Sequence, residues 1–367
     1  IGTDPGMDVG DEVWYYSDNS ADYSNKTTFW IAKGMQNSNE PLVDYWNGTQ
    51  WGKAMFVGIR DCNVFIENID KVPDLSAYDK ETWKAEVKVL KAFYHFWLMR
   101  MYGPIPIVKE NIPVSADENE VRVVRDKIDD IVAYTVSLID ESVDYLPLNI
   151  QNEAAEMGRI TRPAAKAIKA KILAFAASPF FNGNLDYANF KNADGEPFFN
   201  QVYDGEKWTK AAEACLDAIQ CAEEAGHGLY EFVNMSSTKL SEETVLSLTN
   251  RCKVTERWNK ELVWGCGQSG IRDLQVLCQP WLESNYSSDD RYHNARNGTF
   301  APTLAVAETF YTKNGVPMDE DRSYDYDNRY TTQVATEADK YYIQPGYTTA
   351  KLHFDREPRF YATLGFD

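Results

Sequence analysis

One long amphipathic helix is the feature that most constrains what this chain can fold into. Within Asp79–Tyr102 apolar side chains recur at steps of three and four residues, and Gly103-Pro104 follows directly. The members of this series are Trp83, Val87, Leu90, Tyr94, Trp97 and Met101. Phenylalanines add apolar surface on other faces, so we expect this helix to pack on two sides. Trp83 and Trp97 should lie in the core.

Five further segments have helical patterns with recognisable starts or ends. We expect a first helix within Asp44–Ile69, a third from an N-cap at Asp126 to Pro147, a fourth from Thr161 to about Ala177, a fifth over Trp208–Ala225, and a later one over Thr303–Lys313. The fifth should pack through Ala212, Cys215, Ile219 and Ala222, and Asn314-Gly315 should form a left-handed C-cap on the last.

Short connections between these segments predict antiparallel helix pairs, 44–69 with 79–102 and 126–146 with 161–178. The fourth helix is rich in alanine, which lets a neighbouring helix approach closely. Large residues, small positions and terminal prolines recur as in tetratricopeptide units, although no strict 34-residue period is present. The sequence therefore predicts a mostly α fold of helix pairs, with an irregular helical bundle as the alternative.

Residues 226–367 differ in character from the helical residues 1–225. Short apolar runs alternate with Gly, Ser, Asn and Asp, and Glu261–Trp264 has the pattern of a strand followed by loops. Residues 319–350 are acidic and rich in tyrosine. We therefore expect two regions, a helical scaffold over 1–225 and a loop-rich ligand-binding region over 226–367 that packs on it.

The charge of the chain excludes several classes of partner. Its formal net charge is -19, with an isoelectric point near 4.7. A protein that binds nucleic acid neutralises phosphates with Lys and Arg, so no nucleic-acid partner is expected. An anionic membrane surface is disfavoured for the same reason. Neutral ligands and cations remain possible.

Motifs for catalysis, metals and cofactors give no positive signal. The six cysteines form no CxxC pair, and neither HExxH nor GxSxG occurs. Gly265–Gly270 spells GxGxxG after the possible strand, but Pro280 interrupts any following helix, so a flexible loop is the simpler interpretation. Asp319–Ser323 resembles the start of a calcium loop, yet tyrosines occupy its sixth and twelfth positions. An irregular cation site remains an alternative to a solvated acidic loop, and no cofactor is expected.

Several longer segments are more specific, and together they resemble the SusD/RagB family. They are Leu90–Trp97, Met101–Val108, Gly158–Ala165, Ala177–Gly183, Pro302–Gly315 and Arg356–Tyr361. Their order and spacing agree with the family from about residue 10 to the end. The resemblance implies a right-handed superhelix of tetratricopeptide-like helix pairs with an irregular loop-rich region. It also implies a lipid-anchored protein on the extracellular face of the outer membrane, which binds oligosaccharides as the lid of a SusC-like TonB-dependent transporter.

Two departures from the family pattern affect what we expect of the chain. The N-terminal cysteine that carries the lipid is absent, and the sequence stops soon after Arg359-Phe360, where relatives continue. The chain is therefore expected to be the N-terminal two-thirds of a longer protein.

The expected ligand site consists of aromatic side chains in polar, loop-forming segments. Sugar rings stack on Trp and Tyr, and their hydroxyls need polar partners. The candidate residues are Trp46, Trp51, Trp281, Asn285, Tyr286, Asp289, Arg291 and Tyr292. Each aromatic ring could equally pack in the core.

The leading hypothesis is glycan binding on the cell surface and delivery to the transporter, without enzymatic activity. Peptide or glycoprotein binding on the same scaffold is the alternative. A glycosidase is a third hypothesis, which rests only on abundant carboxylates and aromatics.

Overall fold

The structure, a computed structural model, describes residues 9–15, 27–50, 52–267 and 300–366, together with Gly6 and Cys278. The chain forms two compact units. The helical unit comprises Asp44–Gly228 and Leu262–Gly267, and the loop-rich unit comprises Ile1–Val43, Leu229–Glu261 and Gln268–Asp367. The division into functional regions 1–225 and 226–367 stays a prediction, because compactness alone does not show where ligand binds.

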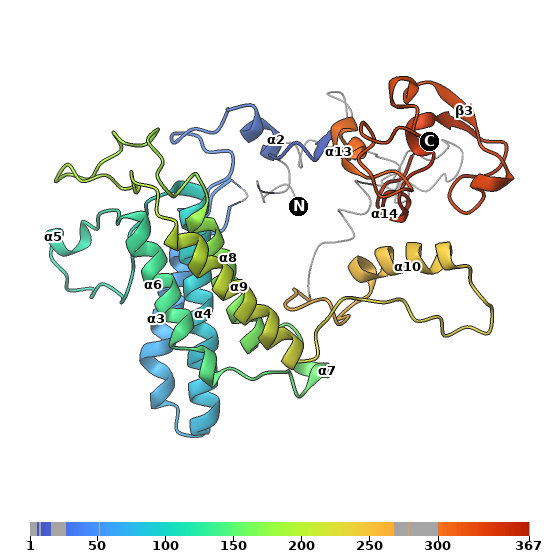
Figure 1. Cartoon of the computed structure of the whole chain (residues 1–367). Helices are drawn as coiled ribbons and strands as arrows, with labels where there is room; N and C mark the ends of the chain where they lie inside the picture. Colours follow the sequence, from blue (N-terminus) through green and yellow to red (C-terminus); the bar gives the residue numbers. More distant parts are fainter. Residues whose placement is uncertain are drawn as a thin grey trace, which may run out of the picture. The chain divides into compact units, whose positions relative to one another are not determined.

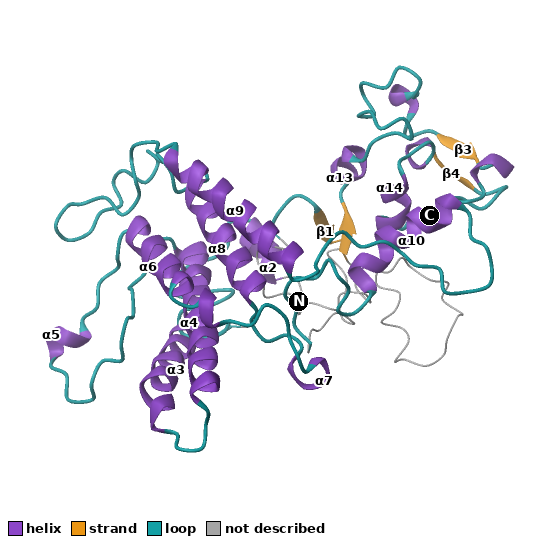
Figure 2. Ribbon diagram, turned by 60° about the horizontal axis from the view of Figure 1, so that its bottom comes forward, coloured by secondary structure: helices purple, strands orange, loops and turns teal. Residues whose placement is uncertain are grey.

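The helical unit contains most of the long helices and is coloured from blue to olive in Figure 1. Its elements are α3 (Met55–Asn68), η2 (Ile69–Lys71), α4 (Ala77–Tyr102), α5 (Glu118–Val121), α6 (Ile128–Asp140), η3 (Val143–Tyr145), α7 (Glu153–Glu156), α8 (Arg162–Ala177) and α9 (Glu206–Glu224). Helices α3 and α4 lie side by side, as do α8 and α9 (Figures 1 and 2).

Helix α4 ends at Tyr102, as the sequence predicts, and begins at Ala77, two residues before the predicted start. Both ends have a physical cause. The Ser76 hydroxyl accepts a hydrogen bond from the backbone N–H of Asp79 (3.1 Å) at the N-terminus. Gly103 adopts a φ of 69° and donates its N–H to the carbonyl of Met99 (2.9 Å), which ends the helix. The tryptophan prediction is only partly correct, because Trp97 is half-buried whereas Trp83 is 36% exposed. Trp83 lies near the end of the α3–α4 hairpin, where the guanidinium of Arg159 lies 5.6 Å from its ring centre.

The third expected helix begins later than predicted. Asp126 is not its N-cap; the carboxylate instead accepts a hydrogen bond from the backbone N–H of Ile107 (2.7 Å), and Lys127 occupies the cap position. Helix α6 ends at Asp140, well before Pro147, and a short 3-10 turn follows. Polar side chains near a helix start can thus serve a neighbouring segment, which sequence alone does not reveal.

Close packing of small side chains joins α8 to α9. Thr161 caps α8, with Pro163 in the first turn, as predicted. The predicted contact face of α9 is wrong by one position. Its buried residues are Ala211, Ala214, Ala218 and Cys221, whereas Cys215 and Ile219 are exposed. Both series have helical spacing, and the face with three alanines is buried because it permits the closest approach to the alanine-rich α8.

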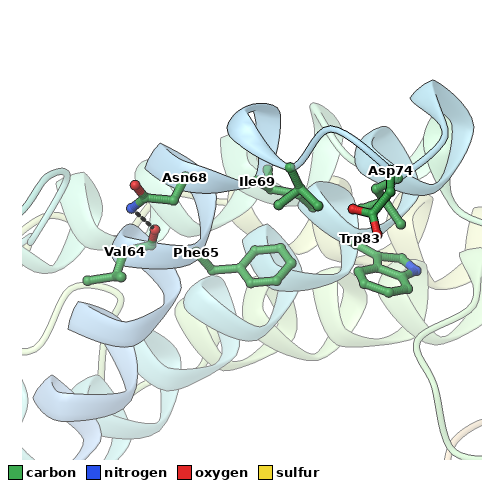
Figure 3. A pocket seen from close by; sticks show the side chains of 8 residues that line it. Val64, Phe65, Asn68, Ile69, Asp74 and Trp83 are labelled. Atoms are coloured by element: carbon green, nitrogen blue, oxygen red, sulfur yellow. Dashed lines mark hydrogen bonds between the residues drawn. The ribbon is translucent and has the colours of Figure 1, made fainter.

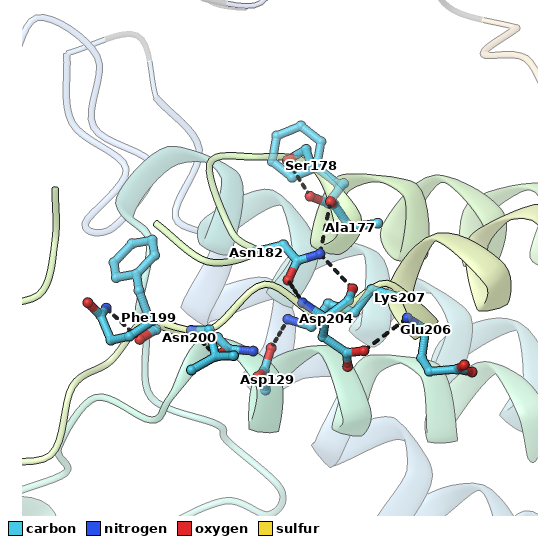
Figure 4. A network of polar contacts seen from close by, with 12 residues as sticks. Asp129, Ala177, Ser178, Asn182, Phe199, Asn200, Asp204, Glu206 and Lys207 are labelled. Atoms are coloured by element: carbon cyan, nitrogen blue, oxygen red, sulfur yellow. Dashed lines mark hydrogen bonds and ion pairs between the residues drawn. The ribbon is translucent and has the colours of Figure 1, made fainter. Parts of the chain in front are cut away.

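The predicted pairing of helices is confirmed for α3 with α4 and only partly correct for the next pair. Helix α6 contacts α8, but it packs mainly on α4, and α8 packs mainly on α9. The long connection between α8 and α9 is fixed by Asn182 (Figure 4). Its amide donates to the carbonyl of Asp204 (2.8 Å), and its side-chain oxygen accepts from the Asp204 N–H (2.8 Å). This reciprocal pair closes the connection so that α9 returns along α8.

The loop-rich unit contains short helices and two small antiparallel sheets. Its elements are β1 (Val13–Tyr15), α2 (Thr27–Ala32), α10 (Glu242–Thr255), β2 (Phe300–Pro302), α13 (Leu304–Thr309), η5 (Tyr326–Asn328), β3 (Thr332–Val334), η6 (Glu337–Asp339), β4 (Thr348–Ala350), η7 (Lys351–His353) and α14 (Pro358–Thr363). Strand β1 pairs with β2, and β3 pairs with β4. Its core cluster consists of Ala307, Met318, Ala335, Ile343, Leu352, Phe354, Phe360 and Tyr361.

Three sequence predictions about the later part of the chain are wrong. Glu261–Trp264 is not a strand but turns and bends, and Trp264 donates its indole N–H to the carbonyl of Gly158 (3.0 Å). The GxGxxG segment therefore lacks the preceding strand of a dinucleotide fingerprint. Helix α10 lies where we expected loops, and α13 ends at Thr309, so Gly315 does not cap it. Gly315, with a φ of 71°, forms a separate tight turn with Thr312.

None of the helices in the described parts of the chain is both long and apolar enough to cross a membrane.

A buried histidine links α4 to the segment that follows it. The His95 side chain is completely buried; its Nδ1 lies 2.8 Å from the carbonyl of Lys91, and its Nε2 accepts the backbone N–H of Val108 (3.2 Å). These partners fit a neutral ring with the proton on Nδ1. Burial lowers the pKa of His95 to about 4; the hydrogen bond to the Lys91 carbonyl opposes this shift, and the charge of the Lys91 side chain adds to it.

Folding should therefore become less favourable in mild acid. The unfolded histidine titrates near 6.5, so the stabilising effect of a neutral ring is complete above that pH and decreases as the pH falls toward 4. Between pH 7.5 and 5 we expect a loss of about 2 kcal/mol in the free energy of unfolding from this residue. Urea unfolding at pH 7.5 and at pH 5 measures this loss. In His95→Gln the difference in unfolding free energy between the two pH values should shrink by about 2 kcal/mol. An unchanged difference would contradict a buried, neutral His95.

Candidate functional site

Only one of the eight predicted site residues lies in the described part of the chain. Outside it are Trp51, Trp281, Asn285, Tyr286, Asp289, Arg291 and Tyr292. The structure therefore does not test whether these residues gather around a ligand, and they stay a prediction. Trp46 is described, and it lies in the helical unit.

Trp46 is half-buried and held by its neighbours. Its ring meets those of Phe56 (centroids 4.8 Å apart) and Tyr102 (5.5 Å) edge-on, and the guanidinium of Arg125 lies 5.2 Å from the ring centre. The buried Asp44 carboxylate accepts the Trp46 N–H (2.9 Å), which fixes the turn. The ring is thus preorganised, but much of it already contacts protein, so its role as a second aromatic platform stays a prediction.

A more open aromatic site lies in the loop-rich unit. We call the four residues Glu308, Tyr326, Arg329 and Tyr330 the tyrosine–arginine cluster. The Arg329 guanidinium lies 3.9 Å from the ring centre of Tyr326 and 4.3 Å from that of Tyr330. Its Nε donates to Oε1 of Glu308 (2.7 Å), and the Tyr330 hydroxyl donates to the same oxygen. Tyr330 remains 53% exposed. The cluster therefore presents a fixed, solvent-exposed aromatic ring with polar groups at its edge.

The electrostatics of the cluster hold Glu308 as a carboxylate. Partial burial opposes its ionisation, but the hydrogen bonds from Tyr330 and Arg329 outweigh burial and hold the pKa of Glu308 below its ordinary value. The same hydrogen bond to Glu308 raises the pKa of the Tyr330 hydroxyl. In the described structure both bonds use Oε1, which leaves Oε2 as an acceptor for a ligand hydroxyl.

Arg356 positions the helix that carries Glu308. It is 2% exposed, and its guanidinium donates to the carbonyls of Ala307 (2.8 Å), Phe310 (2.6 Å) and Leu352 (2.8 Å). The last carbonyls of a helix lack partners within the helix, so a cation there satisfies them and also interacts favourably with the helix dipole. Arg356 belongs to a segment that the sequence comparison singled out, and it acts on the site through α13.

The acidic segment at Asp319–Ser323 has a structural explanation. The Asp321 carboxylate accepts hydrogen bonds from Thr312 Oγ1 (2.6 Å), Asn314 Nδ2 (2.9 Å) and Ser323 Oγ (2.7 Å). These bonds hold the pKa of Asp321 well below its ordinary value. No group of three or more His, Cys, Asp and Glu side chains suited to a metal ion occurs among the described residues. Asp321 therefore stabilises a loop through neutral donors.

Sequence reasoning missed the tyrosine–arginine cluster. The excess of tyrosine in 319–350 pointed to the region, and the spacing of Tyr326 and Tyr330 around Arg329 was visible. Glu308, however, comes from a separate helix, and nothing in its sequence context signals the contact.

Comparison with known families covers both ends of the chain. Residues 6–173 match SusD-like_3, described as "Starch-binding associating with outer membrane", and residues 271–367 match SusD_RagB, described as "SusD family". The solved structure of BT4246 is 28% identical, with a TM-score of 0.76, and the alignment covers 98% of this chain and 61% of that one. The chain belongs to the SusD/RagB family.

Other SusD-like structures share the fold at lower identity. A SusD-like carbohydrate binding protein (BF0978) from Bacteroides fragilis is 17% identical over 96% of this chain and 51% of its own length, with a TM-score of 0.57. Surface glycan-binding protein A from Bacteroides uniformis is 16% identical over 97% and 62%, with a TM-score of 0.53. A comparison with curated protein sequences found no significant match.

The SusD-like assignment confirms the expected fold class. The chain is mostly α, with tetratricopeptide-like helix pairs and an irregular loop-rich part. It spans about three-fifths of the length of the BT4246 structure that it matches. The family that matches residues 6–173 is described as associating with the outer membrane.

Proposed function

We propose that this SusD-like chain belongs to a cell-surface protein that binds an oligosaccharide or polysaccharide. The observation that carries the proposal is the tyrosine–arginine cluster, in which an exposed ring is fixed next to an unused carboxylate oxygen. Sugars present apolar C–H faces to such a ring and hydroxyls to such an acceptor. The printed names of two related structures, a carbohydrate binding protein and a glycan-binding protein, support the same ligand class.

The charge distribution favours neutral glycans over anionic ones. The chain has a net charge of -19, and the cationic group of the cluster, Arg329, is already neutralised by Glu308. A sulfated or uronic-acid chain would therefore meet a repulsive field without a free cation in the cluster to offset it.

The cluster does not favour hydrolysis. A glycosidase needs two carboxyl groups across the scissile bond, one of them protonated to act as the acid. Glu308 has a lowered pKa and is the only carboxylate in the cluster. We therefore propose a binding protein without enzymatic activity.

Glycan binding is tested by a panel of neutral and acidic oligosaccharides, followed by calorimetry on any ligand found. Tyr330→Ala should weaken binding by about 1–3 kcal/mol, by analogy with the stacking of nucleobases on aromatic side chains. Tyr341→Ala is the matched control, because Tyr341 is equally exposed (52%) in the same unit but has no carboxylate partner in the described structure. Trp281→Ala and Tyr286→Ala extend the series to the site predicted from sequence.

Two results would contradict this proposal. One is a panel on which the chain binds no glycan. The other is an equal effect of Tyr330→Ala and Tyr341→Ala, which would move the site away from the cluster.

We further propose that the protein lies on the extracellular face of the outer membrane, held by a lipid anchor outside this chain, and delivers its ligand to a SusC-like TonB-dependent transporter. Membership of the family supports this partner. The lipidated full-length protein should co-purify with a large β-barrel protein from gently solubilised membranes. Repeated isolation of the protein alone would count against the transporter.

A further inference from the structure

An apolar hollow of the helical unit lies at the end of the α3–α4 hairpin (Figure 3). It has a volume of about 440 Å³. Its lining residues are Val64, Phe65, Asn68, Ile69, Val72, Asp74, Leu75 and Trp83. We call it the Trp83 pocket. Val64 is 40% exposed and Trp83 is 36% exposed, so apolar side chains face water here. A preformed hollow lined mainly by apolar side chains with one charged group is a candidate interaction site.

The walls of the Trp83 pocket are fixed in place. The guanidinium of Arg159 lies 5.6 Å from the ring centre of Trp83. Arg159 is itself held by ion pairs with Glu86 (2.9 Å) and Glu156 (2.5 Å). The indole therefore has little freedom to fold into the hollow and fill it. A ligand would find the pocket already formed, which lowers the cost of binding.

The polar groups of the pocket do not suit a sugar. Asn68 donates its amide to the carbonyl of Val64 (2.7 Å), as the dashed line in Figure 3 shows, and its oxygen accepts from Lys71 Nζ (2.7 Å). Of the lining side chains this leaves two groups to bind a hydroxyl, the Asp74 carboxylate and the indole N–H of Trp83. A sugar ring would bury several hydroxyls without partners, which is costly, whereas an apolar side chain needs none. The pocket thus differs in kind from the tyrosine–arginine cluster.

The charge of the pocket lining indicates which charged groups a ligand should carry. Asp74 is the one ionisable residue in the lining, it is exposed, and it has no hydrogen bond or ion pair in the described structure. Nearby lysines are engaged elsewhere, since Lys84 pairs with Asp70 (2.7 Å) and Glu81 (3.0 Å). A cation placed beside an inserted apolar group would therefore meet an unpaired carboxylate.

We propose that the Trp83 pocket is a docking site for a partner polypeptide that inserts one or two leucine-sized side chains flanked by lysine or arginine. The volume suits side chains of this size, the lining is apolar, and Asp74 complements the flanking cation. This site belongs to the helical unit and is independent of the glycan site proposed above. Failure of either proposal leaves the other intact.

The test uses three capped peptides that contain the sequences Lys-Leu-Leu-Lys, Glu-Leu-Leu-Glu and Lys-Ser-Ser-Lys. Binding to the intact chain is followed by NMR shift perturbation. The first peptide should bind at least tenfold more tightly than the other two, because it alone supplies both the apolar groups and the cations. Asp74→Asn should reduce the ratio of affinities between Lys-Leu-Leu-Lys and Glu-Leu-Leu-Glu severalfold. Binding of the leucine side chains should persist in this variant.

A matched pair of variants assigns the binding to the pocket. Val64→Asp places a charge in the lining and should weaken the first peptide at least tenfold. Val57→Asp changes an exposed valine of the same helix (55% exposed) outside the pocket and should leave binding unchanged. Glycan affinity, where measured, should be the same in both variants. Equal binding of Lys-Ser-Ser-Lys, equal effects of the two variants, or no binding of any peptide at millimolar concentration would overturn the proposal.

Discussion

The buried guanidinium of Arg356 is the interaction on which the loop-rich unit depends. It brings a charge into the core, where burial lowers its pKa, and it satisfies that charge with three backbone carbonyls, two at the end of α13 and one at Leu352. The side chain also stacks on Phe360, 4.5 Å from the ring centre. Because the carbonyls of Ala307 and Phe310 close the end of α13, the position of Glu308 follows from this one residue. The orientation of Arg329 and Tyr330 follows in turn from Glu308.

This hierarchy separates the scaffold from the ligand site. The segments that identify the family have structural roles here: Gly103 ends α4, Asn182 closes the α8–α9 connection, and Arg356 fixes α13. None of these side chains is exposed for ligand binding. Tyr326, Arg329 and Tyr330 of the tyrosine–arginine cluster and the lining of the Trp83 pocket lie outside those segments, although Glu308 lies within Pro302–Gly315. The same scaffold can therefore present different surface chemistry.

The sequence predicts elements whose causes are local. Helices α4 and α8 follow from apolar period, capping residues and a terminal glycine or an initial proline, all within a few positions. The contact face of α9 was misplaced because two helical series one residue apart compete, and the choice depends on how closely α8 can approach. Asp126 was misassigned because its partner, Ile107, lies in another segment. The tyrosine–arginine cluster could not be predicted for the same reason. It joins a helix to a later turn through contacts that no local sequence pattern encodes.

A double-mutant cycle between Arg356 and Tyr330 tests the central claim most directly. Glycan affinity is measured for the wild type, Arg356→Lys, Tyr330→Ala and the double variant, with near-UV circular dichroism to show that each is folded. If Arg356 acts through the cluster, Arg356→Lys alone should weaken glycan binding, whereas the same substitution in the Tyr330→Ala variant should cause little further loss of affinity. The coupling energy between the two positions should be about 0.5–3 kcal/mol. The control Arg359→Lys, at an exposed arginine that pairs with Glu357, should change nothing. Strictly additive effects in folded protein, or an unchanged affinity in Arg356→Lys, would contradict the account.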